Sequence, residues 1–177
     1  MNRLFIGIGS NVGNQHRNLI DAIKRVAALP DTTVRSTSSI YETEPVGGPP
    51  QEWYLNCVIE AESDLTPLYL LKALKGIERA MGRKESVRHG PRVVDLDILL
   101  YGNLFVEEKD LTIPHRELHK RAFVLIPLLE IDENLIHPCL HKPLKQLLAD
   151  LGKTPAVKLY PKPLPLNYNN GLREAII

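Results

Sequence analysis

The stretch from residue 93 to residue 102 reads VVDLDILLYG and predicts a strand with two different faces. Because side chains alternate along a strand, Asp95 and Asp97 are expected to point the same way. The opposite face would carry an apolar set suited to a core: Val94, Leu96, Ile98 and Leu100. Two carboxylates on one face repel each other and lose hydration unless a cation binds between them. The stretch therefore predicts a strand that belongs to the core and also holds a charged ligand.

The elements before this strand complete an α+β pattern. Thr66-Pro67 predicts a helix start, because a capping hydroxyl precedes a proline at the first helical position, and Gly82 suits its end. Further upstream the sequence predicts a first strand over residues 4–8, a helix over residues 14–30 that Asn14 can cap, and strands over residues 34–41 and 54–61. The order is that of a ferredoxin-like βαββαβ sandwich.

The segments after residue 102 are predicted as additions to this sandwich. They comprise a hairpin-like stretch over residues 102–115 and helices over residues 123–129 and 143–151. We predict one domain over residues 1–152. Residues 153–177 contain four prolines and are predicted as an extended C-terminal tail, to which no chemistry is assigned.

Composition narrows the class of protein. A chain of 177 residues suits one domain with a filled core. The formal net charge of +1 argues against a general nucleic-acid binder, which carries a basic excess. Cys57 and Cys139 are read as free thiols of a reducing compartment. No apolar run reaches the roughly 20 residues of a membrane span, so we expect a cytoplasmic protein without a membrane partner.

Cations cluster just before the carboxylate pair. Arg83, Lys84, Arg88 and Arg92 all lie within a short polar segment. Magnesium prefers oxygen ligands and shares them with phosphates, and guanidinium groups bind phosphate. The combination outlines a nucleoside triphosphate site, in which two metal ions roughly 3.5–4 Å apart could be held. The alternative is an edge strand with a solvated acidic face and a loop whose arginines pair with nearby acids.

Two further motifs are assigned no chemistry. Residues 7–13 read GIGSNVG, whose spacing differs from that of a dinucleotide-binding fingerprint, and are predicted as a turn and a helix start. His137, Cys139 and His141 lack the pattern of a fourth zinc ligand and are predicted as loop and packing residues.

The motifs together closely resemble one family. Residues 88–102 read RHGPRVVDLDILLYG, and residues 111–131 read LTIPHRELHKRAFVLIPLLEI. With the earlier segments FIGIGSNVGN, ETEPVG, WYLNCV and GIERAMGR, they resemble the 6-hydroxymethyl-7,8-dihydropterin pyrophosphokinases. The resemblance covers roughly residues 2–151. It implies transfer of diphosphate from ATP to the hydroxymethyl group of the pterin, with release of AMP, in folate biosynthesis.

The resemblance also implies roles for individual residues. Asp95 and Asp97 are expected to hold two Mg²⁺ ions, and Arg83 and Arg92 to steady the transferring group. The pterin would lie between Tyr54 and Phe123, with Asn56 reading its polar edge and Thr43, Pro45 and Val46 completing the pocket. The expected ATP-binding positions are Lys75, Glu78, Arg88, Arg92, Ile98, Thr112, His115, Arg116 and Arg121.

Three positions depart from the family pattern. His89 stands where a tryptophan is frequent, Lys75 where a glutamine is frequent, and Arg116 where a tyrosine is frequent. The resemblance implies small-molecule substrates and does not say whether a partner enzyme of the pathway is bound. An alternative reading is a non-catalytic ferredoxin-like module that binds ATP or RNA, although the aromatic pattern of an RNA-binding sheet is missing.

Overall fold

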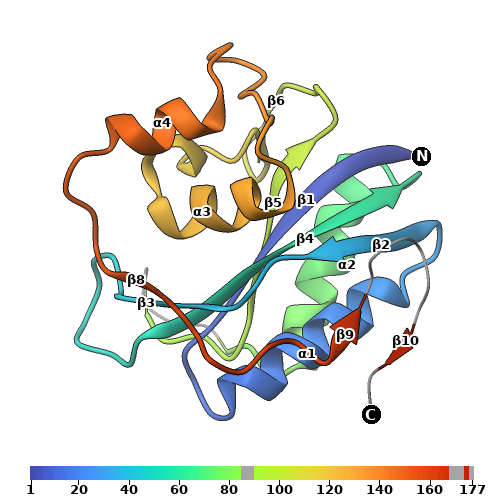
Figure 1. Cartoon of the computed structure of the whole chain (residues 1–177). Coiled ribbons are helices and arrows are strands. Elements are labelled where there is room, and N and C mark those ends of the chain that lie inside the picture. The colour runs from blue at the N-terminus through green and yellow to red at the C-terminus, as the bar shows by residue number, and fades with distance from the viewer. Residues whose placement is uncertain (85–89, 168–173, 176–177) are drawn as a thin grey trace.

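A six-stranded antiparallel sheet forms the middle of the protein in the computed structural model, which describes residues 1–84, 90–167 and 174–175. The strand order is β5-β1-β4-β3-β8, with β2 also paired to β4 (Figure 1). The bounds of these strands are Asn2–Ser10 (β1), Thr32–Thr37 (β2), Tyr41–Thr43 (β3), Tyr54–Ser63 (β4), Asp95–Tyr101 (β5) and Val157–Leu159 (β8). The order β5-β1-β4-β2 is the predicted ferredoxin-like arrangement, which the structure confirms.

Helices cover both faces of the sheet (Figure 1). The predicted helices α1 (Gln15–Ala27) and α2 (Pro67–Ala80) bury their apolar stripes against one face, where Leu4, Ile6 and Ile8 of β1 point. The other face carries the smaller helices α3 (Ala122–Ile131) and α4 (Leu144–Asp150), which pack on Phe5 and Val58. The described residues therefore form two cores, one on each side of the sheet.

The two large helices begin where local chemistry predicts. The Asn14 side chain accepts a hydrogen bond from the Arg17 N–H at 3.1 Å, and the Thr66 hydroxyl accepts one from the Tyr69 N–H at 3.4 Å. Each cap satisfies a backbone donor that has no partner within the helix. Gly82 has a φ of +91°, a conformation that suits glycine at the end of α2.

One predicted strand is divided in two. Residues 34–41 were expected to be continuous, but β2 and β3 are separated at residues 38–40. The reason is Ser38, which is buried and whose hydroxyl accepts the hydrogen bond of the Val58 N–H at 2.9 Å. A side chain thus takes the place of a backbone partner, and the regular ladder stops there.

The alternation along β5 breaks after residue 98. Ile6 pairs with Ile98 and Phe5 with Leu100, so Leu99 is an extra residue between two pairs. A bulge of this kind changes the face on which the following side chains lie. Leu96 and Ile98 join the α1–α2 core as predicted, but Leu100 joins the α3–α4 core. The predicted side for Leu100 was therefore wrong.

The remaining elements lie around this sandwich. The predicted hairpin is formed by β6 (Val106–Glu107) and β7 (Thr112–Ile113), and a short 3₁₀ helix, η1, spans Leu118–Lys120. In the tail, β8 joins the sheet beside β3, and β9 (Leu166–Asn167) pairs with β10 (Glu174–Ala175). The domain boundary at residue 152 stays a prediction, although β8, which lies beyond it, pairs with the main sheet.

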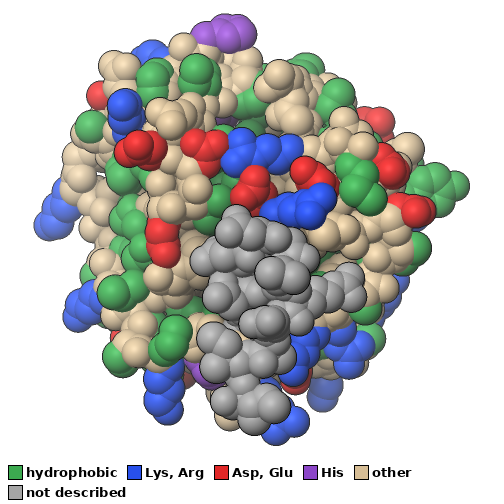
Figure 2. Space-filling model, turned by 45° about the vertical axis from the view of Figure 1, so that its right-hand side comes forward, with side chains coloured by type: hydrophobic (Ala, Val, Ile, Leu, Met, Phe, Trp, Pro, Cys, Tyr) green, Lys and Arg blue, Asp and Glu red, His purple; other side chains and the backbone are tan. Residues whose placement is uncertain are grey.

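The surface mixes acidic and basic side chains. Arg3 bonds to Glu60 at 2.6 Å and to Asp132 at 2.9 Å, and Arg35 bonds to Glu62 at 3.0 Å. Figure 2 shows charges of both signs lying side by side on the face that it presents, in keeping with the net charge of +1. Among the described residues, no helix has both the length and the apolar character needed to cross a membrane.

A pair of substitutions in α2 tests the burial of its stripe. Leu74 is fully buried against the sheet, whereas Leu68 on the same helix is 44% exposed. Leu74→Ala should lower the free energy of unfolding by about 2–5 kcal/mol, because it removes packed methyl groups and leaves a cavity. Leu68→Ala should change it by less than about 0.5 kcal/mol. Urea unfolding measures both, and equal losses would contradict the assigned orientation of α2.

Candidate active site

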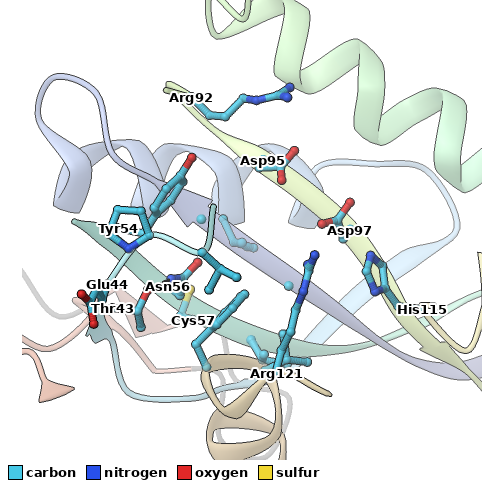
Figure 3. Close-up of a pocket in the computed structure, with 18 of the residues that line it drawn as sticks. Thr43, Glu44, Tyr54, Asn56, Cys57, Arg92, Asp95, Asp97, His115 and Arg121 are labelled. Atoms are coloured by element: carbon cyan, nitrogen blue, oxygen red, sulfur yellow. Dashed lines mark hydrogen bonds between the residues drawn. The ribbon is translucent and has the colours of Figure 1, made fainter. Parts of the chain in front are cut away.

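A cavity of about 300 Å³ opens on the face of the sheet that carries α3. Strands β1, β4 and β5 form its floor, and loops and α3 form its walls (Figure 3). Its lining comprises Gly7, Ile8, Gly9, Thr43, Glu44, Pro45, Val46, Gly47, Gln51, Tyr54, Asn56, Cys57, Val58, Gly90, Arg92, Asp95, Asp97, Leu99, His115, Arg121, Phe123 and Val124.

Two glycines of β1 make room for this cavity. Gly7 pairs with Asp97 on one side and Val58 on the other, and Gly9 pairs with Asp95 and Asn56. A Cβ atom on Gly9 would lie 2.5 Å from Asn56 Oδ1, closer than any allowed contact. The prediction that residues 7–13 form only a turn and a helix start was wrong, since β1 continues to Ser10. The alternation Ile-Gly-Ile-Gly within a strand was the missed signal.

The carboxylates of Asp95 and Asp97 lie on the same side of β5, as predicted, and both line the cavity (Figure 3). Burial, followed by the nearby charge of Asp95, raises the pKa of Asp97 to about 7. Lys75 and Arg121 oppose this rise and Glu78 adds to it. The described residues contain no cluster of three or more His, Cys, Asp or Glu side chains suited to a metal. Mg²⁺, however, needs only one or two carboxylates when phosphates complete its shell.

A buried glutamate connects α2 to the start of β5. Glu78 is only 1% exposed, and its Oε1 accepts from the Leu96 N–H at 2.7 Å and from Lys75 Nζ at 2.8 Å. Its Oε2 accepts from Arg83, which also donates to Asp95 Oδ1 at 3.0 Å. Lys75 and Glu78 therefore bind each other outside the cavity lining, and Arg83 reaches one of the two cavity carboxylates.

All six residues predicted to bind the pterin line the cavity: Thr43, Pro45, Val46, Tyr54, Asn56 and Phe123. The Tyr54 hydroxyl donates to the Gly90 carbonyl at 3.1 Å, and burial raises its pKa, with a smaller contribution from the charge of Asp95. Asn56 Nδ2 donates to Thr43 Oγ1 at 2.5 Å, which orients the amide. The Arg121 guanidinium lies 5.6 Å from the centre of the Phe123 ring.

The residues predicted to bind ATP are divided between the cavity and its surroundings. Arg92, His115 and Arg121 line it, and Figure 3 shows Arg121 reaching toward Asp97 and His115. Burial, assisted by Arg121, lowers the pKa of His115 to about 4, so its ring is neutral at pH 7. Ile98 is buried in the α1–α2 core, and Thr112 and exposed Arg116 lie outside the lining. Arg88 and His89 lie outside the described residues.

Asn11 is a residue that sequence reasoning missed. It is 3% exposed, its N–H donates to the Arg92 carbonyl at 3.0 Å, and its Oδ1 accepts from the Arg92 N–H at 2.8 Å. Its Nδ2 donates to Gln51 Oε1 at 2.9 Å and to the Glu52 carbonyl at 3.0 Å. Asn11 thus joins three segments around the cavity. Nothing in the local pattern separates it from Asn14, which only caps a helix.

Comparisons with known proteins point to one family. The family described as 7,8-dihydro-6-hydroxymethylpterin-pyrophosphokinase (HPPK) matches residues 5–133. The 2-amino-4-hydroxy-6-hydroxymethyldihydropteridine pyrophosphokinase of Methylorubrum extorquens is 41% identical over 136 residues, covering 77% of this chain and 86% of the relative. The protein of the same name from Haemophilus influenzae is 42% identical over 134 residues, covering 76% of this chain and 84% of the relative.

Longer proteins contain a similar region. Folic acid synthesis protein FOL1 of Dictyostelium discoideum is 41% identical over 140 residues, or 79% of this chain, which spans only 21% of that protein. A crystal structure of Plasmodium falciparum HPPK-DHPS matches the fold with a TM-score of 0.65 at 15% identity, over 85% of this chain and 43% of that one.

The family match spans most of the chain, and two relatives that the chain covers by more than four fifths are about two fifths identical over the aligned residues. The chain therefore belongs to the 7,8-dihydro-6-hydroxymethylpterin-pyrophosphokinase family and is a diphosphotransferase of folate biosynthesis.

Proposed function

We propose that the chain transfers diphosphate from ATP to the hydroxymethyl oxygen of 6-hydroxymethyl-7,8-dihydropterin and releases AMP. The observation that carries the proposal is one cavity with aromatic and amide groups on one side and two carboxylates with cations on the other. A volume of about 300 Å³ lies at the small end of ligand pockets and suits a single bicyclic ring. A cytoplasmic location and a lack of nucleic-acid and membrane partners stay predictions.

The aromatic side of the cavity would hold the pterin. Tyr54 and Phe123 would stack on the ring, a contact worth about 0.5–1.5 kcal/mol beyond the buried area. Because Asn56 Nδ2 is bound to Thr43, its Oδ1 is the atom available to accept a hydrogen bond from an amino or ring N–H. This pairing would orient the hydroxymethyl arm toward β5.

The donor set at Asp95 and Asp97 fits magnesium. Two adjacent carboxylate oxygens in a site that raises the pKa of Asp97 are the environment that a divalent cation stabilises. When bound, Mg²⁺ would neutralise phosphate charge and help to align the attacking oxygen with the β-phosphorus. We propose that Asp95 and Asp97 hold two such ions.

The cations would then stabilise the transferring group. Arg92 and Arg121 line the cavity, and Arg83 lies against Asp95, so all three could bind phosphate oxygens through paired N–H groups. As the oxygen of the pterin bonds to the β-phosphorus, negative charge develops on the departing AMP. Fixed guanidinium groups lower the energy of that state without reorganising. His115, neutral at pH 7, would donate or accept a hydrogen bond without adding charge.

AMP release tests the reaction and the carboxylates together. AMP should form from ATP and Mg²⁺ only when 6-hydroxymethyl-7,8-dihydropterin is present. Asp95→Asn and Asp97→Asn should each lower kcat by roughly 10²–10³-fold, because the transferring charge loses its stabilisation. Asp110→Asn, in the exposed hairpin turn, is the control and should keep wild-type turnover. Full activity in the Asp97 variant would exclude the proposed metal site.

The raised pKa of Asp97 predicts that a substitution that lowers turnover will raise the stability of the metal-free protein. The pKa of this carboxyl group is about 7 in the folded protein and near 4 in the unfolded chain, so the folded protein loses stability as the pH rises from 4 through 7. Asp97→Asn removes this loss, so the Tm of the metal-free protein at pH 8 should rise by several degrees. The gain should shrink as pH falls toward 4. Thermal unfolding at several pH values measures it, and a pH-independent difference would contradict the assignment.

The glycine floor gives a third prediction. Gly9→Ala would drive a Cβ atom against Asn56 Oδ1 and displace the amide. The KM for the pterin should rise by about tenfold, a loss of ~1.4 kcal/mol, while the KM for ATP changes little. Gly76→Ala on α2 meets no atom within 4 Å and serves as the control, with unchanged KM values. Equal KM values for both variants would show that Asn56 does not bind the pterin.

A further inference from the structure

The C-terminal segment Ala156–Tyr160 lies along the strand that leads into the cavity. Within it, β8 pairs with β3, so that Val157 lies opposite Thr43 and Leu159 opposite Tyr41. Figure 1 shows the two strands together at one edge of the sheet, next to the loop that follows β3. The region matched by the family model ends at residue 133, so this segment lies outside that region.

Ala156 and Glu44 are bonded to each other twice. The Glu44 N–H donates to the Ala156 carbonyl at 3.1 Å, and the Ala156 N–H donates to Glu44 Oε2 at 3.3 Å. Glu44 lines the cavity between Thr43 and Pro45, two residues of the proposed pterin site. The two bonds therefore hold the backbone at the point where the chain leaves β3 and enters the cavity wall.

Lys158 reaches the other end of the same loop. Its Nζ lies 5.2 Å from the centre of the Trp53 ring, a distance typical of a cation–π contact. Trp53 directly precedes Tyr54, which lines the cavity. A single short segment thus contacts both ends of the loop over residues 44–53.

The segment is itself held on the body of the protein. The Tyr160 N–H donates to the Ile40 carbonyl at 2.9 Å, and the His16 ring on α1 lies 6.1 Å from the Tyr160 ring. His16 Nε2 is also 3.1 Å from the Pro163 carbonyl. These contacts give the segment a fixed position from which it can support the loop.

The effect of this support falls on one side of the cavity. Thr43 Oγ1 accepts the hydrogen bond that orients the Asn56 amide, so the position of β3 sets the direction in which Asn56 Oδ1 points. Figure 3 shows Thr43 and Glu44 across the cavity from Asp97 and His115. A displacement of β3 would therefore disturb the aromatic and amide side before it reached the carboxylates.

We propose that the segment Ala156–Tyr160 is a positioning element of the substrate cavity, and that it sets the affinity for the flat heterocyclic substrate without affecting the nucleotide. The proposal rests on the proposed function, because it assigns the Thr43–Asn56 side to the heterocycle. The residues that act are Ala156, through Glu44, and Lys158, through Trp53 and β3.

Lys158→Pro is the sharpest perturbation. Glu44 is hydrogen-bonded to Ala156, and Ile40 to Tyr160. Hydrogen-bonded pairs recur at every second position of an antiparallel ladder, so the pair between them, Glu42 and Lys158, is also of this kind and the Lys158 N–H faces β3. Proline removes that donor and separates the strands. Lys162→Pro is the matched control, because Lys162 is exposed and its backbone N–H has no hydrogen bond to any residue that the structure describes.

The readout is equilibrium binding of 6-hydroxymethyl-7,8-dihydropterin, in the presence of Mg²⁺ and a non-hydrolysable ATP analogue, together with steady-state KM values for both substrates. Lys158→Pro should weaken binding of the pterin by about tenfold and leave the KM for ATP within about twofold. Lys162→Pro should match the wild type. Unchanged pterin binding in Lys158→Pro, or equal losses for both substrates, would overturn the proposal.

A milder pair covers the case in which the proline variant does not fold. Lys158→Ala removes only the cation over Trp53 and should weaken pterin binding by about two- to fivefold, relative to Lys162→Ala. No loss here would also overturn the proposal. If the wild type binds the pterin but forms no AMP, the proposed reaction fails, whereas the binding comparison still decides the role of the segment.

Discussion

The structure depends on the cost of holding two carboxylates side by side in a site that is partly closed to water. Asp95 and Asp97 share one face of β5, and burial together with the charge of Asp95 raises the pKa of Asp97. Arg83 offsets part of this repulsion through its bond to Asp95, while the charges of Lys75 and Arg121 oppose the rise in the pKa of Asp97. Arg83 and Arg121 are also two of the cations that we propose bind the triphosphate. Two carboxylates that repel each other in this way would be stabilised by a divalent cation, which is the basis of the proposed metal site.

Glu78 makes this arrangement possible. A carboxylate that is 1% exposed would be costly if unpaired, but a backbone N–H, Lys75 and Arg83 satisfy it. Since the backbone donor belongs to Leu96, between the two cavity carboxylates, Glu78 connects α2 to the point of β5 where we propose that the metal is held. Lys75 Nζ donates to Glu78 Oε1 at 2.8 Å and so takes part in this connection.

The cavity itself results from what β1 lacks. Ile6 and Ile8 fill the α1–α2 core, while Gly7 and Gly9 leave the opposite face open between Asp95, Asp97 and Asn56. Glycine weakens a strand interior, and the central position of β1, paired on both sides, offsets that loss. The walls come from distant segments, which Asn11 and the C-terminal β8 join by hydrogen bonds.

Local patterns were enough to predict the order of the elements, the caps at Asn14 and Thr66, and the shared face of Asp95 and Asp97. These features depend on residues within a few positions of one another, where periodicity and capping chemistry act directly. The division at Ser38, the bulge at Leu99 and the extension of the sheet by β8 depend on partners far away in the chain. The same holds for the site. The motifs and the family resemblance named half of the residues that line the cavity. The pairing of Lys75 with Glu78, the floor formed by Gly7 and Gly9 and the bonds of Asn11 arise only when strands and loops meet in space, because no periodicity encodes a contact between distant segments.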